Sequence, residues 1–177
     1  MNIGTALTIK GWMTPGELEF LAELASESDI IVEFGCYHGR STRALGDNAR
    51  GIVYAVDTWA KEYWDYDGKP IGLMHDNNVE TFKENLKDLI KAGKVIPCVC
   101  KTVFFNLDRY ADFIFIDADH RYESVKADIA RAKQLIKPGG IIAGHDYTDG
   151  YSPGVKKAVD EAFPICEVSN SIWCVRL

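Results

Sequence analysis

The chain has 177 residues, of which 47% are hydrophobic and 26% charged, and its formal net charge is −6. This length suits one α/β domain, the acidic balance argues against a nucleic-acid partner, and no apolar run approaches the roughly 18 residues of a membrane-spanning helix. The N-terminal sequence MNIGTALTIKGW lacks the pattern of a signal peptide, so we expect a cytoplasmic protein with no membrane partner.

The first predicted element is a helix within an N-terminal helical segment that we place at residues 1–28. The stretch TPGELEFLAELASES begins with Thr14, Pro15 and Glu17, the pattern of a capping box with proline at the first helical position. Apolar residues then recur at helical spacing, namely Leu18, Leu21, Ala22 and Ala25. The segment therefore predicts one amphipathic helix before the first strand.

Three strands and two helices follow in the first half of the chain. DIIVEFG predicts a short apolar strand, and a helix is expected from about residue 40 to residue 48. GIVYAVD predicts a second strand that ends in Asp57. HDNNVETFKENLKDLIKAG carries its apolar residues on one helical face and ends at Gly93. KVIPCVC predicts a third strand, in which Pro97 favours an edge position.

The second half of the chain begins with ADFIFID, an unbroken apolar run typical of a central strand that is covered on both faces. A helical pattern follows and ends before Pro138, and IIAGHD predicts the fifth strand. A further helix is expected around residues 155–163. The last two strands, ICEVS and SIWCVRL, meet across Asn170 and Ser171, so we expect them to pair as an antiparallel hairpin.

Five strands separated by helices, then a hairpin, predict a doubly wound, Rossmann-like α/β fold. We expect a seven-stranded sheet, mostly parallel with a C-terminal antiparallel hairpin, and a single domain over residues 1–177. Residues 58–74 are the least regular stretch and carry four aromatic side chains, Trp59, Tyr63, Trp64 and Tyr66. This insertion predicts either a substrate loop or an aromatic cover for the sheet edge.

The stretch IVEFGCYHGRST, residues 31–42, joins the first strand to the next helix through Gly35 and Gly39. Glycines at such a turn let a ligand approach the backbone, and the helix start presents free N–H groups. The spacing is not GxGxxG, and Glu33 would repel a pyrophosphate but attract a cation. S-adenosylmethionine (SAM) has an amino group, a positive centre and a carboxylate for these amides, so the pattern favours SAM.

Asp57 ends the second strand, where a carboxylate can accept hydrogen bonds from both hydroxyls of a ribose. Dinucleotide-binding folds use an acid at the same place. Asp57 therefore predicts binding of a nucleoside without identifying which one.

Titratable side chains gather at the ends of the fourth and fifth predicted strands. They are Asp117, Asp119, His120, His145 and Asp146. In an open α/β sheet this edge binds ligands. Methyl transfer to an alcohol needs an aligned nucleophile together with a base, or a cation that lowers the pKa of the hydroxyl. The cluster therefore predicts a catalytic site, in which we expect His120, His145 and Asp146 to act.

Taken together, these motifs resemble the class I SAM-dependent methyltransferases over residues 29–177. The resemblance rests on ExGxxxG after the first strand, an acid ending the second, FIFIDADHRYESVKADI, LIKPGGIIAGHDY and the terminal hairpin. It is greatest with small-molecule O-methyltransferases whose fourth strand ends IDxDHxY, a group similar to catechol-type and sugar O-methyltransferases. The resemblance implies a hydroxylated small-molecule acceptor, such as a sugar or a phenol.

The resemblance also implies which residues hold SAM. Its methionine end would lie against Glu33, Gly35 and Gly39, with Tyr37 and Ser41 near the carboxylate. The ribose would bind Asp57, with Thr58 or Trp59 beside it, and the adenine would lie near Lys101 and Thr102. The family often has an acid at that last position, and this sequence has none.

In the catechol-type pattern, the fourth-strand aspartate and a pair after the fifth strand bind Mg²⁺. Carried over, Asp117 and Asp146 become metal ligands, with His145 at the other pair position. The usual pair is acid–acid or Asp–Asn, and a histidine favours a softer divalent ion such as Mn²⁺ or Zn²⁺. Either His145 or His120 could instead be the general base. The alternative is that Asp117 caps a helix or binds the amino group of SAM and no metal is involved.

Three other functions are considered on the same fold. An NAD(P)-dependent oxidoreductase predicts GxGxxG and a catalytic Tyr–Lys pair, and neither occurs here. A non-catalytic SAM-binding module predicts a strand-end edge without titratable groups. Methylation of nucleic acid or protein would favour a basic groove or an NPPY-type motif where this chain has DADH. A homodimer that completes the acceptor pocket stays an open alternative.

Overall fold

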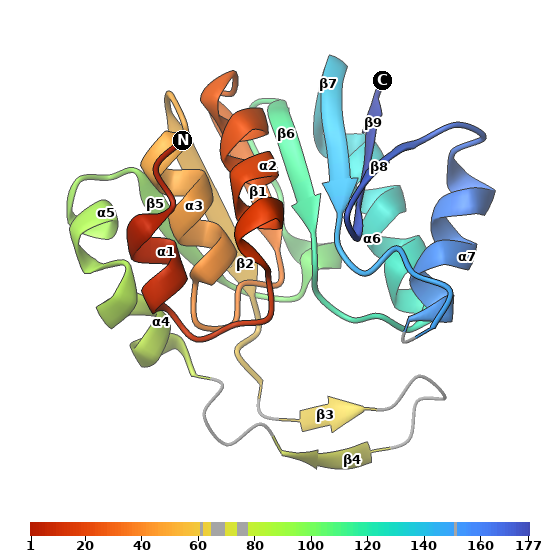
Figure 1. Cartoon of the computed structure of the whole chain (residues 1–177), viewed down its shortest axis with the longest axis horizontal. Coiled ribbons are helices and arrows are strands. Elements are labelled where there is room, and N and C mark those ends of the chain that lie inside the picture. The colour runs from red at the N-terminus through yellow and green to blue at the C-terminus, as the bar shows by residue number, and fades with distance from the viewer. Residues whose placement is uncertain (61, 65–69, 74–77, 151) are drawn as a thin grey trace.

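A seven-stranded sheet in the order β5-β2-β1-β6-β7-β9-β8 runs through the protein in the computed structural model, which describes residues 1–60, 62–64, 70–73, 78–150 and 152–177 (Figure 1). Its strands are β1 (Ile30–Phe34), β2 (Ile52–Asp57), β5 (Val95–Val99), β6 (Ala111–Ile116), β7 (Ile136–Gly144), β8 (Glu167–Ser169) and β9 (Ile172–Arg176). Strands β5, β2, β1, β6 and β7 are parallel to one another, and β9 pairs antiparallel with both of its neighbours, β7 and β8. The predicted sheet is confirmed, including the edge position of the strand that contains Pro97.

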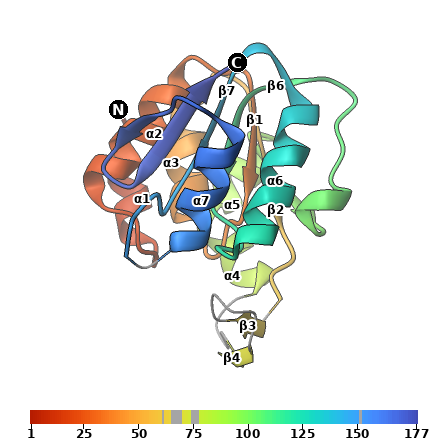
Figure 2. The same ribbon diagram turned by 90° about the vertical axis from the view of Figure 1, so that its right-hand side faces the viewer.

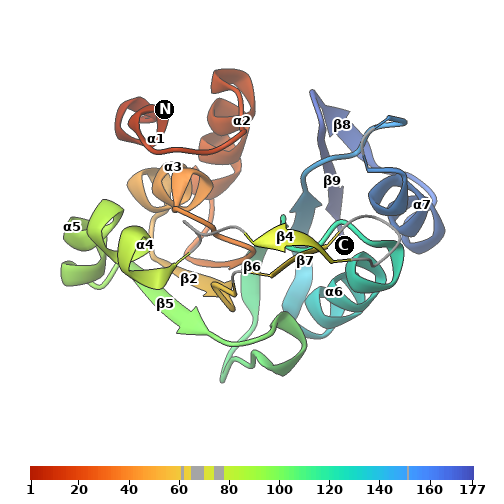
Figure 3. The ribbon, with the colours of Figure 1, turned by 90° about the horizontal axis from the view of Figure 1, so that it is seen from below.

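Helices cover both faces of this sheet (Figure 3). On one face lie α1 (Gly4–Thr8), α2 (Pro15–Ser26), α3 (Arg40–Asn48), α4 (Val79–Asn85) and α5 (Lys87–Lys91). On the other face lie α6 (Tyr122–Leu135) and α7 (Pro153–Ala162). Two apolar cores result, one on each side of the sheet, and strands β1 and β6 contribute to both. Among the described residues, no helix is long and apolar enough to cross a membrane.

Local sequence accounts for the start of α2. Thr14 caps the helix by accepting a hydrogen bond from the Glu17 backbone N–H, while the Glu17 side chain accepts from the Thr14 backbone, and Pro15 is the first helical residue. The predicted capping box is therefore confirmed. The segment also contains the short helix α1, which was not predicted separately.

Two predicted helices differ from the structure. The helix expected over HDNNVETFKENLKDLIKAG is interrupted at Leu86, which ends α4 and precedes α5. Between β5 and β6, where the prediction of strands separated by helices requires a crossover helix, the described residues form only the 3₁₀ turn η1 (Thr102–Phe104). The stretch KTVFFNLDRY has no run of apolar residues at helical spacing, and Phe105 packs on the sheet instead.

The insertion at residues 58–74 contains a small antiparallel hairpin of β3 (Glu62–Trp64) and β4 (Pro70–Leu73). The sequence did not predict this hairpin. It extends beyond the edge of the main sheet at which β6 ends (Figures 1 and 2). Residues 61, 65–69 and 74 of the predicted substrate loop, which include Tyr66, lie outside the described residues.

Candidate functional site

The carboxyl ends of the parallel strands are level with one another, which places their following residues at one edge of the sheet. Phe34 pairs with Val56 and with Ile116, and Ile116 pairs with Gly144. This edge lies at the bottom of Figure 1. The predicted site residues that follow these strands are therefore neighbours, as the sequence indicated.

The glycine turn after β1 passes close to the loop after β6. Gly35 has a φ of 85°, and a Cβ atom built on it would lie 2.2 Å from the backbone oxygen of Asp117. Gly39 has a φ of 90° and begins α3. Both glycines thus adopt the left-handed conformation that other residues rarely take, and at Gly35 the space itself excludes a side chain.

Asp57, the predicted ribose ligand, holds this turn in place. Its Oδ2 accepts hydrogen bonds from the backbone N–H groups of Cys36 at 2.8 Å and Tyr37 at 3.0 Å. Its Oδ1 accepts from the backbone N–H of Trp59 at 2.7 Å. The carboxylate therefore connects the ends of β1 and β2 within the protein itself.

Glu33 is a buried carboxyl group with one oxygen that lacks a partner. The residue is 0% exposed, and its Oε2 accepts a hydrogen bond from the Thr42 hydroxyl. Its Oε1 has no hydrogen-bond partner among the described residues. Burial raises the pKa of Glu33 to about 7, against the opposing effect of the Ser41 and Thr42 hydroxyls. A cation beside Oε1 would satisfy this group, because an opposite charge favours the ionised form.

The other predicted cofactor residues lie around the same turn in different environments. Ser41 is buried in the first turn of α3, and the Tyr37 ring stacks on His38 with centroids 3.9 Å apart. Thr58 is exposed, whereas Trp59 is buried against Phe82. The Trp59 indole N–H donates to the backbone oxygen of Tyr37 at 2.8 Å.

Thr102 follows β5, where the resemblance implies the adenine. Its hydroxyl donates to Asp128 of α6, which is 4% exposed. Burial raises the pKa of Asp128 to about 6. The chain has no acidic residue next to Thr102 in the sequence, but Asp128 of α6 lies beside it in the structure.

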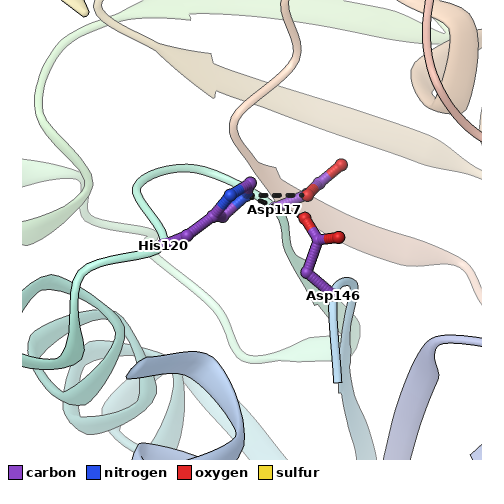
Figure 4. Close-up of side chains that lie close together, drawn as sticks. All are labelled: Asp117, His120 and Asp146. Carbon is purple, nitrogen blue, oxygen red and sulfur yellow. Dashed lines mark ion pairs between the residues drawn. The ribbon is translucent and has the colours of Figure 1, made fainter. Parts of the chain in front are cut away.

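Asp117, His120 and Asp146 form one compact group at the ends of β6 and β7 (Figure 4). The Nε2 atom of His120 lies 3.2 Å from Asp146 Oδ2 and 3.5 Å from Asp117 Oδ1. One potential ligand atom from each residue lies within 4.8 Å of the others. Burial lowers the pKa of His120, but the two carboxylates outweigh it, so the net pKa lies above its ordinary value.

His145, the third ligand implied by the resemblance, lies beside the same two carboxylates and also faces Glu17. Its Nδ1 is 3.4 Å from Asp146 Oδ2 and 3.7 Å from Asp117 Oδ1, while its Nε2 is 3.3 Å from Glu17 Oε1. Burial lowers its pKa, but Asp146, Asp117 and Glu17 together raise the pKa of His145 to about 9. The ring therefore lies between acids and favours the protonated form.

Comparison with known proteins identifies the family. A family model described as a methyltransferase domain matches residues 32–147, which span both the glycine turn and the Asp117–Asp146 site. The chain belongs to this methyltransferase family. A search of curated protein sequences found no match.

Solved structures share the fold of this methyltransferase. An O-methyltransferase from Bacillus cereus in complex with SAH (S-adenosylhomocysteine) has a TM-score of 0.66 and 18% identity, covering 97% of this chain and 86% of that one. A putative rRNA-methylase from Clostridium thermocellum has a TM-score of 0.66 and 16% identity, covering 93% and 99%. The O-methyltransferase TomG from Streptomyces achromogenes, in complex with SAM, has a TM-score of 0.63 and 14% identity, covering 93% and 81%.

The candidate site also contains residues that the sequence analysis did not single out. Glu17 and Ser171 contact His145, Thr42 contacts Glu33, and Asp128 contacts Thr102. Conversely, Asp119 does not join the strand-end group, because its side chain accepts from the Arg121 backbone and from Ser124. A capping box fully explained Glu17 in the sequence, so no signal pointed to its second contact.

Proposed function

We propose that this methyltransferase transfers a methyl group from SAM to a hydroxyl group of a small molecule, with a divalent cation at Asp117 and Asp146. One observation carries the proposal. The buried, unsatisfied Oε1 of Glu33 and the group formed by Asp117, His120 and Asp146 lie at the same sheet edge. A site for a cationic ligand and a site for proton transfer therefore adjoin.

The glycine turn fits the methionine end of SAM. Glu33 Oε1 offers an acceptor to an ammonium group, and burial makes that contact strong once the carboxyl is ionised. The first turn of α3, which starts at Arg40, leaves backbone N–H groups for a carboxylate. Asp57 retains lone pairs for a ribose hydroxyl while it holds the turn. SAM supplies an electrophilic methyl group on a sulfonium centre.

The strand-end group fits a divalent cation. Two carboxylates and one imidazole converge, and His120 Nε2 has no hydrogen-bond partner among the described residues. Carboxylate oxygens suit Mg²⁺ and Mn²⁺. The cation would supply charge stabilisation for a hydroxyl that loses its proton. We therefore assign the cation to Asp117 and Asp146 and leave His120, the imidazole grouped with them, free to accept a proton.

His120 is our candidate for the general base. Its side chain is 32% exposed, so it is accessible to an acceptor, and Asp146 lies close enough to stabilise the imidazolium that forms. His145 is less suited to meet an acceptor, because its side chain is only 10% exposed and its Nε2 faces Glu17. Correct alignment of the acceptor oxygen with the methyl group supplies the remaining rate enhancement.

An open pocket beside this edge is our candidate acceptor site. It measures about 400 Å³ and is lined by Thr148, Asp149, Pro153, Lys156, Lys157, Asp160 and Glu161. The loop that carries His120 adjoins it, since a Cβ on Gly154 would lie 2.8 Å from the His120 backbone oxygen. Lysines and acids in the lining favour a polyhydroxylated acceptor such as a sugar, with a phenol as the second class.

Radiolabelled methyl transfer tests this function. The protein is incubated with methyl-labelled SAM and a panel of sugars, nucleotide sugars and catechols, with Mg²⁺, with Mn²⁺ or with EDTA. We expect labelled product from at least one hydroxylated acceptor and its loss in EDTA. Transfer that is unaffected by EDTA would contradict the metal, and transfer only to RNA, protein or amines would contradict the acceptor class.

A further inference from the structure

One buried carboxylate connects the N-terminal helix α2 to the strand-end site. The side chain of Glu17 is 6% exposed, and its two oxygens have separate partners. Oε2 accepts hydrogen bonds from the Thr14 backbone at 2.7 Å and from the Thr14 hydroxyl at 2.8 Å. This oxygen alone completes the capping box. The second oxygen is not needed for the helix cap.

That second oxygen faces His145. Glu17 Oε1 accepts a hydrogen bond from the Ser171 hydroxyl at 2.5 Å and lies 3.3 Å from His145 Nε2. Ser171 lies in the turn between β8 and β9, and its Oγ is 3.0 Å from His145 Nε2. The imidazole is therefore held on its Nε2 side by two residues that lie far from it in the sequence.

The opposite side of the ring faces the acids of the proposed metal site. His145 Nδ1 lies 3.4 Å from Asp146 Oδ2, and the same Asp146 oxygen lies 3.2 Å from His120 Nε2. Asp146 has a φ of 60°, a left-handed conformation that aspartate adopts more often than most other non-glycine residues. The imidazole beside its carboxylate constrains the direction of this side chain.

We propose that Glu17 is a positioning residue for the strand-end site, acting through His145 on the Asp146 carboxylate. Glu17 and Ser171 fix the ring so that Nδ1 is directed at Asp146, and Asp146 in turn is held against His120. The importance of this arrangement for methyl transfer rests on the proposed function, but the arrangement itself does not. It makes α2 part of the active site as well as a cover for the sheet.

Three variants separate positioning from helix capping. Glu17→Gln retains the capping box, since glutamine serves at that position as well as glutamate, but removes the charge beside His145. Ser171→Ala removes the second contact to Nε2. Thr14→Ala is the matched control, because it weakens the helix cap on Oε2 and leaves Oε1 with its partners.

Histidine ring signals are the primary measurement, because they require no metal or substrate. Ring ¹⁵N–¹H correlation spectra are recorded for each variant, with His145 and His120 assigned by their Asn variants. We expect Glu17→Gln and Ser171→Ala to shift the signals of His145 and, through Asp146, those of His120. Thr14→Ala should lower the melting temperature but leave both sets of signals in place. Unchanged signals in Glu17→Gln would overturn the inference.

Calorimetric titration with Mn²⁺ provides the second measurement. If Glu17 positions Asp146, Glu17→Gln raises the Mn²⁺ dissociation constant about tenfold, as expected for a residue that supports a ligand, whereas Thr14→Ala does not. Signals that shift while Mn²⁺ affinity stays the same would contradict the step from His145 to Asp146. A wild-type protein that binds no Mn²⁺ would contradict the proposed metal, and the His120 signals would then decide the inference alone.

Discussion

His120 and Asp146 meet across the ends of two neighbouring parallel strands, with Nε2 of His120 3.2 Å from Oδ2 of Asp146. The contact links the loop after β6 to the residue pair that follows β7. Because Asp117 lies at the same point, a single cation could bind both carboxylates beside the imidazole. The relationship supports the metal-assisted reaction that we propose at this edge.

The first prediction concerns this metal site. Asp117→Asn or Asp146→Asn removes a charged ligand, so we expect the Mn²⁺ dissociation constant to rise by about tenfold or more. Titration calorimetry measures the change. Asp149→Asn is the control, because that exposed acid lies on the same loop but outside the group. Equal affinities in all three variants would show that Mn²⁺ binds elsewhere.

The second prediction is a pH dependence of cofactor affinity. The pKa of Glu33 is raised to about 7, so the carboxylate that attracts an ammonium group is lost as the pH falls below this value. The dissociation constant of SAH should rise as the pH drops from 7.5 to 5.5, by up to about tenfold per unit. Glu33→Gln should bind SAH weakly and with little pH dependence. A wild-type affinity that is flat over this range would contradict the contact.

The third prediction concerns the stability of the protein without ligand. The pKa of Glu33 is higher in the folded state than in the unfolded state. Its contribution to the free energy of unfolding is therefore greatest below pH 4.5 and is lost as the pH rises through 7. At pH 8 the folded protein contains a buried charge, and Glu33→Gln should raise the free energy of unfolding by about 1–2 kcal/mol. At pH 5 the gain should largely vanish. Urea denaturation at both pH values measures it, and an equal effect at the two values would be inconsistent with a titrating Glu33.

The fourth prediction concerns Gly35. Gly35→Ala adds a Cβ 2.2 Å from the Asp117 backbone oxygen in addition to the strain of a positive φ, so we expect a loss of about 2–4 kcal/mol. Gly93→Ala is matched, because Gly93 has a φ of 72° with no atom within 4 Å of its added Cβ. That variant should lose only about 1–2 kcal/mol. If the two losses measured by urea denaturation were equal, the close contact with Asp117 would be ruled out.

Sequence patterns predicted the sheet because its strands carry strong local signals. The unbroken apolar run before Asp117 required a central strand, and Pro97 required an edge, since proline cannot donate to a neighbouring strand. Parallel strands then bring their carboxyl ends together. For that reason the sequence pattern alone assigns Glu33, Asp57, Asp117 and Asp146 to one edge.

The contacts around His145 could not be predicted in the same way. Whether a ring nitrogen faces a metal site or another acid depends on side-chain direction, which sequence spacing does not determine. Here Glu17, from the far end of the chain, lies against Nε2, and His120 is the imidazole grouped with Asp117 and Asp146. The 3₁₀ turn before β6 was missed for a related reason, because topology rules predict a crossover but not its local conformation.

Titration calorimetry with SAH and with NAD tests the central claim most directly, namely that the Glu33 turn binds the sulfonium cofactor or its product. At pH 7.5 we predict one SAH molecule per chain and no measurable NAD binding, with SAH affinity greatly reduced in Glu33→Gln. NAD binding without SAH binding, or SAH affinity that is unchanged in Glu33→Gln, would contradict the account.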